Sequence, residues 1–152
     1  MPTITPSYLY TFFAVMVVSS ILVASFMDYS GVIRFSAETR KLKNLMDHVA
    51  AETTELLNLA AANATAETFI QAPSAIGNTQ YWLRLRNDSL KAWLEGGFGN
   101  LPTKDAELRV YLPSRVSASG FYISGYGAIH ITCFVNSSLP NLQLSSSSLN
   151  GG

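Results

Sequence analysis

The chain has 152 residues and equal numbers of basic and acidic side chains, so its formal net charge at pH 7 is zero. A neutral chain has no strong electrostatic attraction to polyanions, and we expect no nucleic-acid partner. The single cysteine, Cys133, excludes an intrachain disulfide and any metal site built from several cysteines. The length leaves room for one long helix and one small globular unit.

The first 27 residues contain no charged side chain and no histidine. Residues 8–27 read YLYTFFAVMVVSSILVASFM, about the length of apolar sequence that a helix needs to cross the hydrocarbon core of a bilayer. The segment has neither a basic flank nor a small-residue cleavage site, so we expect it to stay on the chain. Residues 7–27 are therefore predicted to form a membrane helix at some stage, beginning near Pro6, since proline is tolerated in a first helical turn.

Small residues in this segment favour close helix packing. Ser20 and Ala24 are four positions apart, a spacing that lets two helix backbones approach each other. We take these two, with the larger Tyr8, Phe12 and Val15, as candidate helix-packing residues. An ordinary membrane anchor explains the same pattern, so both interpretations stay open.

An amphipathic helix is predicted over residues 32–63, after the turn-like sequence of residues 28–31. Phe35, Leu42, Val49 and Leu56 recur every seven residues and form one narrow apolar stripe, which makes them further packing candidates. The stripe needs a partner. That partner is the chain's own β domain, a neighbouring chain, or both.

A small antiparallel β domain of four to six strands is predicted over residues 64–138, because the apolar period changes there from helical to alternating. Residues 68–71, 79–87 and 107–112 are expected strands, residues 90–95 are expected to form a short strand or a turn, and residues 120–135 read as two strands hinged at residues 125–127. The glycines of residues 96–99 are interpreted as a turn. Residues 139–152, rich in serine and ending in two glycines, are expected to be a mobile polar tail.

No catalytic constellation is recognisable in the sequence. The nucleophile, phosphate-loop and zinc motifs are absent, and the two histidines are far apart, so we expect no enzymatic activity, no cofactor and no metal. Trp82, Arg84 and Arg86 alternate on one strand face and form the one basic-aromatic patch of interest. A polar outer strand face or a subunit contact explains this patch as well as ligand binding does.

The topology signals conflict. The first charges after the apolar segment are mainly basic, which favours a cytoplasmic C-terminal part. Three N-x-[ST] sequons, at Asn63, Asn87 and Asn136, instead favour an exposed domain and are candidate glycosylation sites. A basic leader removed before Met1 reconciles the two signals, and we favour that explanation.

A charge-free helix that continues into an amphipathic half and then a β domain resembles the type IV pilin superfamily, in particular archaeal adhesion pilins and archaellins. The resemblance rests on residues 8–27 and 32–63. The acidic residue that bacterial pilins carry near the start of the mature chain is Thr5 here, which is more like the archaeal branch. The resemblance implies a lollipop-shaped subunit that leaves the membrane when its helices bundle into a filament core, with the β domains outside.

The expected fold is therefore α+β, with residues 1–63 as the long helix, residues 64–138 as the β domain and residues 139–152 as the tail. The expected function is a structural subunit of an extracellular filament whose partners are copies of itself, the membrane before assembly, and surface glycans. The alternatives are a single-pass cell-envelope protein with a β binding domain and a membrane-tethered enzyme.

Overall fold

The computed structural model describes residues 6–63, 65–106, 108–113, 115–136 and 138–147. It contains one helix, α1 (Pro6–Asn63), followed by strands β1 (Thr65–Ile70), β2 (Tyr81–Asn87), β3 (Ala92–Phe98), β4 (Leu108–Tyr111), β5 (Ser117–Ile123), β6 (Ala128–Asn136) and β7 (Leu139–Ser147). The predicted α+β class is confirmed. The chain divides into two compact units, residues 1–37 and 38–152, and the boundary falls within α1.

The helix α1 begins at Pro6, as predicted, and is unbroken to Asn63. The turn-like residues 28–31 are helical, and nothing crowds Gly31. Residues 37–62 are dominated by alanine, leucine and charged residues with long side chains, which have high intrinsic helix propensity and explain the continuation past the apolar segment. A single glycine costs only about 1 kcal/mol within such a helix, so it does not end it.

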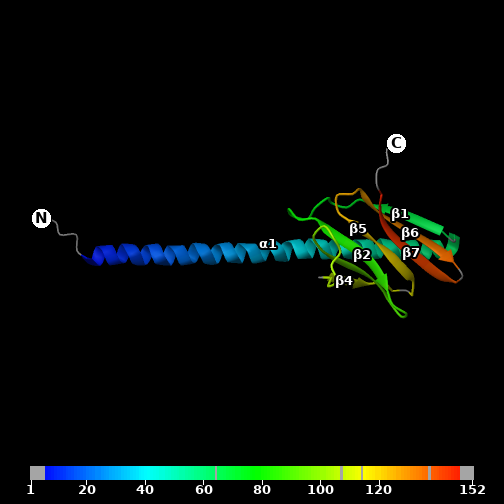
Figure 1. Cartoon of the computed structure of the whole chain (residues 1–152), viewed down its shortest axis with the longest axis horizontal. Coiled ribbons are helices and arrows are strands. Elements are labelled where there is room, and N and C mark those ends of the chain that lie inside the picture. The colour runs from blue at the N-terminus through cyan, green and yellow to red at the C-terminus, as the bar shows by residue number, and fades with distance from the viewer. Residues whose placement is uncertain (1–5, 64, 107, 114, 137, 148–152) are drawn as a thin grey trace. The chain divides into compact units, whose positions relative to one another are not determined.

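The seven strands form one mostly antiparallel sheet in the order β1-β6-β7-β5-β2-β3-β4 (Figure 1). The C-terminal strand β7 lies between β6 and β5. It pairs antiparallel with β6 and parallel with β5. The two strands predicted within residues 120–135 exist as β5 and β6, but they are not paired with each other, because β7 separates them.

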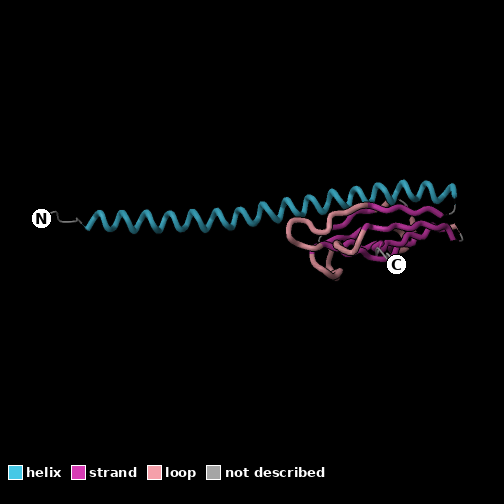
Figure 2. Tube along the Cα trace, turned by 90° about the horizontal axis from the view of Figure 1, so that it is seen from above, coloured by secondary structure: helices cyan, strands magenta, loops and turns pink. Residues whose placement is uncertain are grey.

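The core lies between the sheet and the second half of α1. Figure 2 shows residues 38–63 running along one face of the strands. Leu42, Met46, Val49, Leu56 and Ala60 on the helix are buried. They pack in one cluster with the inward side chains of the sheet, which include Leu83, Leu94, Ile131, Cys133 and Leu144. The open question about the amphipathic stripe is answered for its central residues, which the chain's own sheet covers.

The predicted mobile tail is wrong for residues 139–147, which form β7 in the middle of the sheet. Leu142 and Leu144 are buried, and they alternate with polar residues in the two-residue period of a strand. The serine-rich composition hid this short alternation. Residues 148–152 lie outside the described residues.

The predicted glycine turn is wrong for Gly96 and Gly97, which lie within β3, whereas Gly99 lies in the bend that follows the strand. A Cβ at Gly96 would stand 2.7 Å from Sδ of Met46, and one at Gly97 would stand 2.9 Å from Cζ2 of Trp82. Both faces of the strand are thus occupied, by α1 on one side and by an indole on the other. Glycine here allows close packing and not a chain reversal.

The packing of α1 on the sheet predicts that the same Leu→Ala substitution lowers the free energy of unfolding by different amounts at different positions of the helix. We expect Leu42→Ala to lower the free energy of unfolding by about 2–5 kcal/mol, because it leaves a cavity under a fully buried side chain. The measurement is urea unfolding of the full chain in detergent micelles, followed by fluorescence of Trp82 and Trp93. Leu59→Ala is the control, since Leu59 is 51% exposed, and equal losses in the two variants would contradict the packing.

Candidate functional site

The most extensive unusual surface is on the first half of α1. Every large apolar side chain from Tyr8 to Phe35 is exposed. The helix is long and apolar enough to cross a membrane, and none of its most apolar stretch is buried. A soluble chain rarely leaves an apolar patch larger than a few hundred Å² uncovered, so this surface marks an interaction with lipid or protein.

Two of the hydroxyl groups on this surface are hydrogen-bonded within the helix. The hydroxyl of Thr11 donates to the carbonyl oxygen of Ser7 at 2.9 Å, and that of Ser20 donates to Met16 at 2.8 Å. Such internal bonds lower the cost of placing a hydroxyl among apolar groups. These two hydroxyls therefore add little to the cost of covering the surface with lipid or with another helix.

The predicted helix-packing residues separate into two groups. Tyr8, Phe12, Val15, Ser20 and Ala24 are exposed in the first half of α1, and Phe35 is exposed near its end.

The remaining three, Leu42, Val49 and Leu56, are buried against the sheet. These three stabilise the subunit and are not available to a second chain. The seven-residue spacing placed Phe35 on one stripe with these three and could not say which part of the stripe the sheet would cover.

A shallow depression of about 500 Å³ marks the small residues of the first group. Ser19, Ser20 and Ala24 lie in it, with Val15 and Val23 among the larger residues that surround it. Small side chains lower the helix surface locally, which is the shape that allows a second helix to approach.

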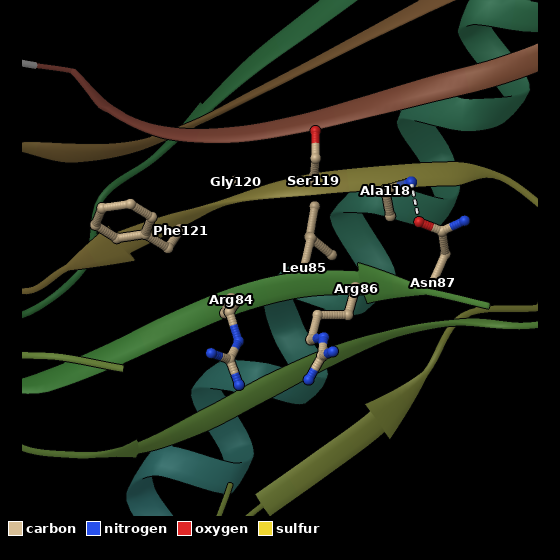
Figure 3. Close-up of a pocket in the computed structure, with 8 residues that line it drawn as sticks. All are labelled: Arg84, Leu85, Arg86, Asn87, Ala118, Ser119, Gly120 and Phe121. Carbon is tan, nitrogen blue, oxygen red and sulfur yellow. Dashed lines mark hydrogen bonds between the residues drawn. The ribbon is translucent and has the colours of Figure 1, made fainter. Parts of the chain in front are cut away.

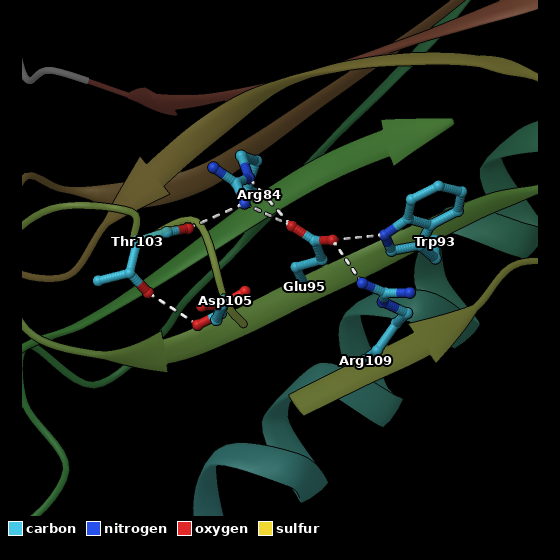
Figure 4. A network of polar contacts seen from close by, with 6 residues as sticks. All are labelled: Arg84, Trp93, Glu95, Thr103, Asp105 and Arg109. Atoms are coloured by element: carbon cyan, nitrogen blue, oxygen red, sulfur yellow. Dashed lines mark hydrogen bonds and ion pairs between the residues drawn. The ribbon is translucent and has the colours of Figure 1, made fainter. Parts of the chain in front are cut away.

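The sheet face opposite α1 carries a buried charge cluster, shown in Figure 4. Glu95 is 1% exposed, although it is an acid on β3. Its Oε2 accepts hydrogen bonds from Nε and Nη2 of Arg84 at 3.1 and 2.6 Å. Its Oε1 accepts from Nε1 of Trp93 at 2.7 Å and from Nη2 of Arg109 at 3.2 Å. One carboxylate thus joins three adjacent strands through cross-strand neighbours.

The environment of Glu95 favours its ionised form. Burial by itself would raise the pKa of this carboxyl, but the hydrogen bonds from Trp93 and Arg84, together with the positive charges of Arg84 and Arg86, lower the pKa below its usual value. The cluster was not recognised in the sequence. The signal that could have found it was the Asp88 turn, whose carboxylate accepts from the backbone N–H groups of Leu90 and Lys91 and fixes the register that sets Arg84 opposite Glu95.

The predicted basic-aromatic patch is only partly present. Arg84 and Arg86 lie on the sheet face away from α1, but Trp82 is fully buried and its ring cannot stack on a ligand. The indole lies over Gly97, and the guanidinium carbon of Arg84 lies 5.4 Å from its ring centre. The indole N–H has no hydrogen-bond partner among the described residues.

Beside the two arginines, a slot of about 290 Å³ opens between β2 and β5 (Figure 3). Its lining includes Arg84, Arg86, Asn87, Ser119 and Phe121. Neither a carboxylate nor a histidine is among the lining residues that the structure describes, so this slot offers binding groups and not a general acid–base pair.

The two histidines and the cysteine do not come together in one site. His130 stacks on Phe69 with ring centres 4.4 Å apart, and its Nε2 lies 3.1 Å from a carboxylate oxygen of Glu67. His48 is exposed on α1, and Cys133 is buried, which raises the pKa of its thiol. Within the described parts of the chain, no group of three His, Cys, Asp or Glu side chains has a metal-binding arrangement.

Comparison of the chain with family models, with curated protein sequences and with solved structures finds no match. The functional argument therefore rests on the surfaces described above.

The sequons differ in what surrounds them. Asn87 and Asn136 are exposed at the ends of β2 and β6, whereas the side chain of Asn63 lies outside the described residues. The side-chain oxygen Oδ1 of Asn87 accepts a hydrogen bond from the backbone N–H of Ala118 at 3.2 Å, so the side-chain nitrogen that would carry a glycan is on the other side of the amide group.

We expect glycosylation of Asn87 when the chain passes through a glycosylating export pathway. Ser89→Ala removes the sequon and keeps the Asn87 contact, so the mass of the exported chain should fall by one glycan. Ser119→Ala is the control, because it lies outside every sequon. An unchanged mass for Ser89→Ala in intact-protein mass spectrometry would refute glycosylation at this site.

The Glu95 cluster predicts a pH-dependent stability. Its pKa is lower in the folded chain than in the unfolded chain, so its contribution is fully present above about pH 4–5 and is lost as pH falls through the folded pKa. We expect Glu95→Gln to cost about 3 kcal/mol near pH 7, because two arginines lose their counter-charge, and to flatten the acid limb of the stability profile.

The measurement is the free energy of unfolding of the full chain in micelles between pH 3 and pH 7. Glu55→Gln, at an exposed helix position, is the matched control. Indistinguishable profiles for the two variants would show that Glu95 does not stabilise the sheet.

Proposed function

We propose that this protein is a structural subunit of an extracellular, type IV pilus-like filament, with no catalytic role. In this proposal the subunits assemble through the first half of α1 and carry their sheet domains on the filament surface. The observation that carries the proposal is the exposed, charge-free apolar surface of residues 6–27. This segment requires a covering of lipid or of other apolar helices.

Energetic magnitudes support a covering that is permanent. Each large apolar side chain left in water costs about 1.5–3 kcal/mol relative to burial. The exposed set from Tyr8 to Phe35 therefore costs far more than the roughly 5–15 kcal/mol that holds a domain folded. The chain begins in the membrane, and it can leave only where neighbouring helices replace the lipid.

The architecture of the second unit also supports this assignment. Leu42, Val49 and Leu56 are buried in the subunit's own core. Residues 38–63 therefore pack against the sheet, and the exposed first half of α1 is the surface that is available for assembly. The depression at Ser20 and Ala24 offers the close approach that a bundle of helices needs.

A second candidate function is a single-pass anchor for a cell-envelope binding domain. The observation that favours it is the length and hydropathy of the first half of α1, which suits a bilayer as well as a bundle. In this case the helix would stay in lipid for the life of the protein. Carbonate extraction separates the two functions, since an anchor stays with the membrane and a shed filament sediments without lipid.

The filament proposal predicts that bulk at the depression blocks assembly without blocking membrane insertion. We expect Ala24→Phe to reduce filaments, counted by electron microscopy of the cell-surface fraction, by at least tenfold, while the monomer stays in carbonate-washed membranes. Leu22→Phe is the control, because position 22 lies on the opposite side of the helix and is already large. Wild-type filament numbers for Ala24→Phe, or no filaments from the unaltered chain, would count against the proposal.

A further inference from the structure

Strand β5 changes its partner at Gly120. Residues 117–120 pair in parallel with β7, whereas residues 121–123 pair with β2 as far as the Arg84–Phe121 pair. Gly120 has a φ of +100°, and a Cβ there would collide with the carbonyl oxygen of Leu144. Glycine is required where the backbone turns toward β7. Beyond Arg84, β2 therefore continues without β5 in register, and the slot opens between them.

The base of the slot is apolar and closed at one end. Leu85 and Ala118 are buried and form part of its lining. At the end of β2 the side chain of Asn87 reaches across to the backbone N–H of Ala118, as the dashed line in Figure 3 shows. This bond ties the two strands together where their backbone register has ended.

The two rims of the slot differ in chemistry. Arg84 and Arg86 come from β2, and Ser119 and Phe121 come from β5. The ring of Phe121 is 53% exposed, although it projects from a strand in the middle of the sheet. One rim therefore offers positive charge, and the other offers a hydroxyl and an accessible aromatic ring.

The two arginines of the slot differ in how the chain holds them. Arg84 donates to Glu95 and to the carbonyl oxygen of Thr103, and Arg109 also donates to Glu95. No hydrogen bond or ion pair of the Arg86 side chain is present among the residues that the structure describes. The nearby acid Asp88 is held by the backbone N–H groups of its own turn. Arg86 is the available cation of the slot.

We propose that this slot binds an acidic sugar unit, one that carries a carboxylate or a sulfate group on a pyranose ring. The planar guanidinium of Arg86 matches either anion with two parallel hydrogen bonds. The ring of Phe121 packs against the C–H face of a pyranose. The hydroxyl of Ser119 serves the sugar hydroxyls.

The dimensions and openness of the slot suit a sugar. A volume of about 290 Å³ is at the small end of ligand sites, enough for one or two sugar units. A site with polar rims and one exposed ring also favours a hydrated ligand, because such a ligand has to lose only part of its hydration shell to bind. The proposal does not depend on whether the chain forms filaments, since every residue of the site lies in the sheet unit.

The test is a titration of the full, unglycosylated chain in micelles of a polyoxyethylene detergent, which has no sugar head group. Isothermal titration calorimetry is carried out with an oligogalacturonate, a sulfated galactan oligosaccharide, a neutral galactan oligosaccharide of equal length, inorganic sulfate and a glutamate-rich peptide. We expect at least one acidic oligosaccharide to bind at least tenfold more tightly than the neutral one. The galacturonate and sulfate arms identify which anion is preferred.

Variants assign the binding to the slot. We expect Arg86→Gln to weaken binding at least tenfold, Arg86→Lys to weaken it less, and Phe121→Ala to weaken it about fivefold. Arg40→Gln, which removes an exposed charge on α1, is the control and should leave binding unchanged. Circular dichroism checks that each variant is folded.

Four results would overturn the proposal. They are equal affinity for the neutral oligosaccharide, inorganic sulfate binding as tightly as the sulfated sugar, tighter binding of the acidic peptide than of either acidic sugar, and an Arg86→Gln variant that binds like the unaltered chain.

Discussion

The need to cover an apolar helix surface governs the organisation of this chain. The helix α1 meets that need in two ways along its length. Residues 38–63 have an apolar stripe that the chain's own sheet covers, whereas residues 6–27 carry no charge and their large apolar side chains are exposed on every side of the helix. A helix with one apolar stripe belongs to a globular core, and a helix that is apolar all round requires lipid or a bundle. The change from one pattern to the other follows the appearance of regular charges after Arg34.

The sheet depends on its last strand. Because β7 fills the space between β6 and β5, the centre of the sheet exists only after almost the whole chain is available. The parallel pairing of β7 with β5 also explains the local features of the outer face. It requires Gly120 in a left-handed conformation, and it separates β5 from the end of β2, which creates the slot. A topological requirement of the fold thus produces the site that we assign to an acidic sugar.

The sequence predicted the elements better than it predicted their neighbours. The start of α1 at Pro6, the burial of Leu42, Val49 and Leu56, and the inward positions on β2 follow from local periodicity, which the structure preserves. The alternation of residues along β2 does not predict the burial of Trp82. Its indole is buried because it lies over Gly97 of β3 and because the guanidinium of Arg84 lies over its ring. The strand β7 was missed because only Leu142 and Leu144 carry its apolar period within a polar run. The Glu95 cluster could be predicted only with the register of the β2–β3 hairpin, which the tight turn at Asp88 determines.

The two candidate surfaces use opposite physical interactions and lie in different units of the chain. The surface of residues 6–27 has no charge, so its affinity for lipid or for other helices is insensitive to salt and is not specific in itself. On the outer sheet face Glu95 forms ion pairs with Arg84 and Arg109, whereas the Arg86 side chain makes no hydrogen bond or ion pair among the described residues, so the specificity that we propose rests on Arg86. A net charge of zero for the whole chain hides this distribution. In this proposal Arg86→Gln weakens sugar binding and leaves the apolar surface unchanged. A filament of such chains would display the same site many times, and multivalency would then increase the effective affinity.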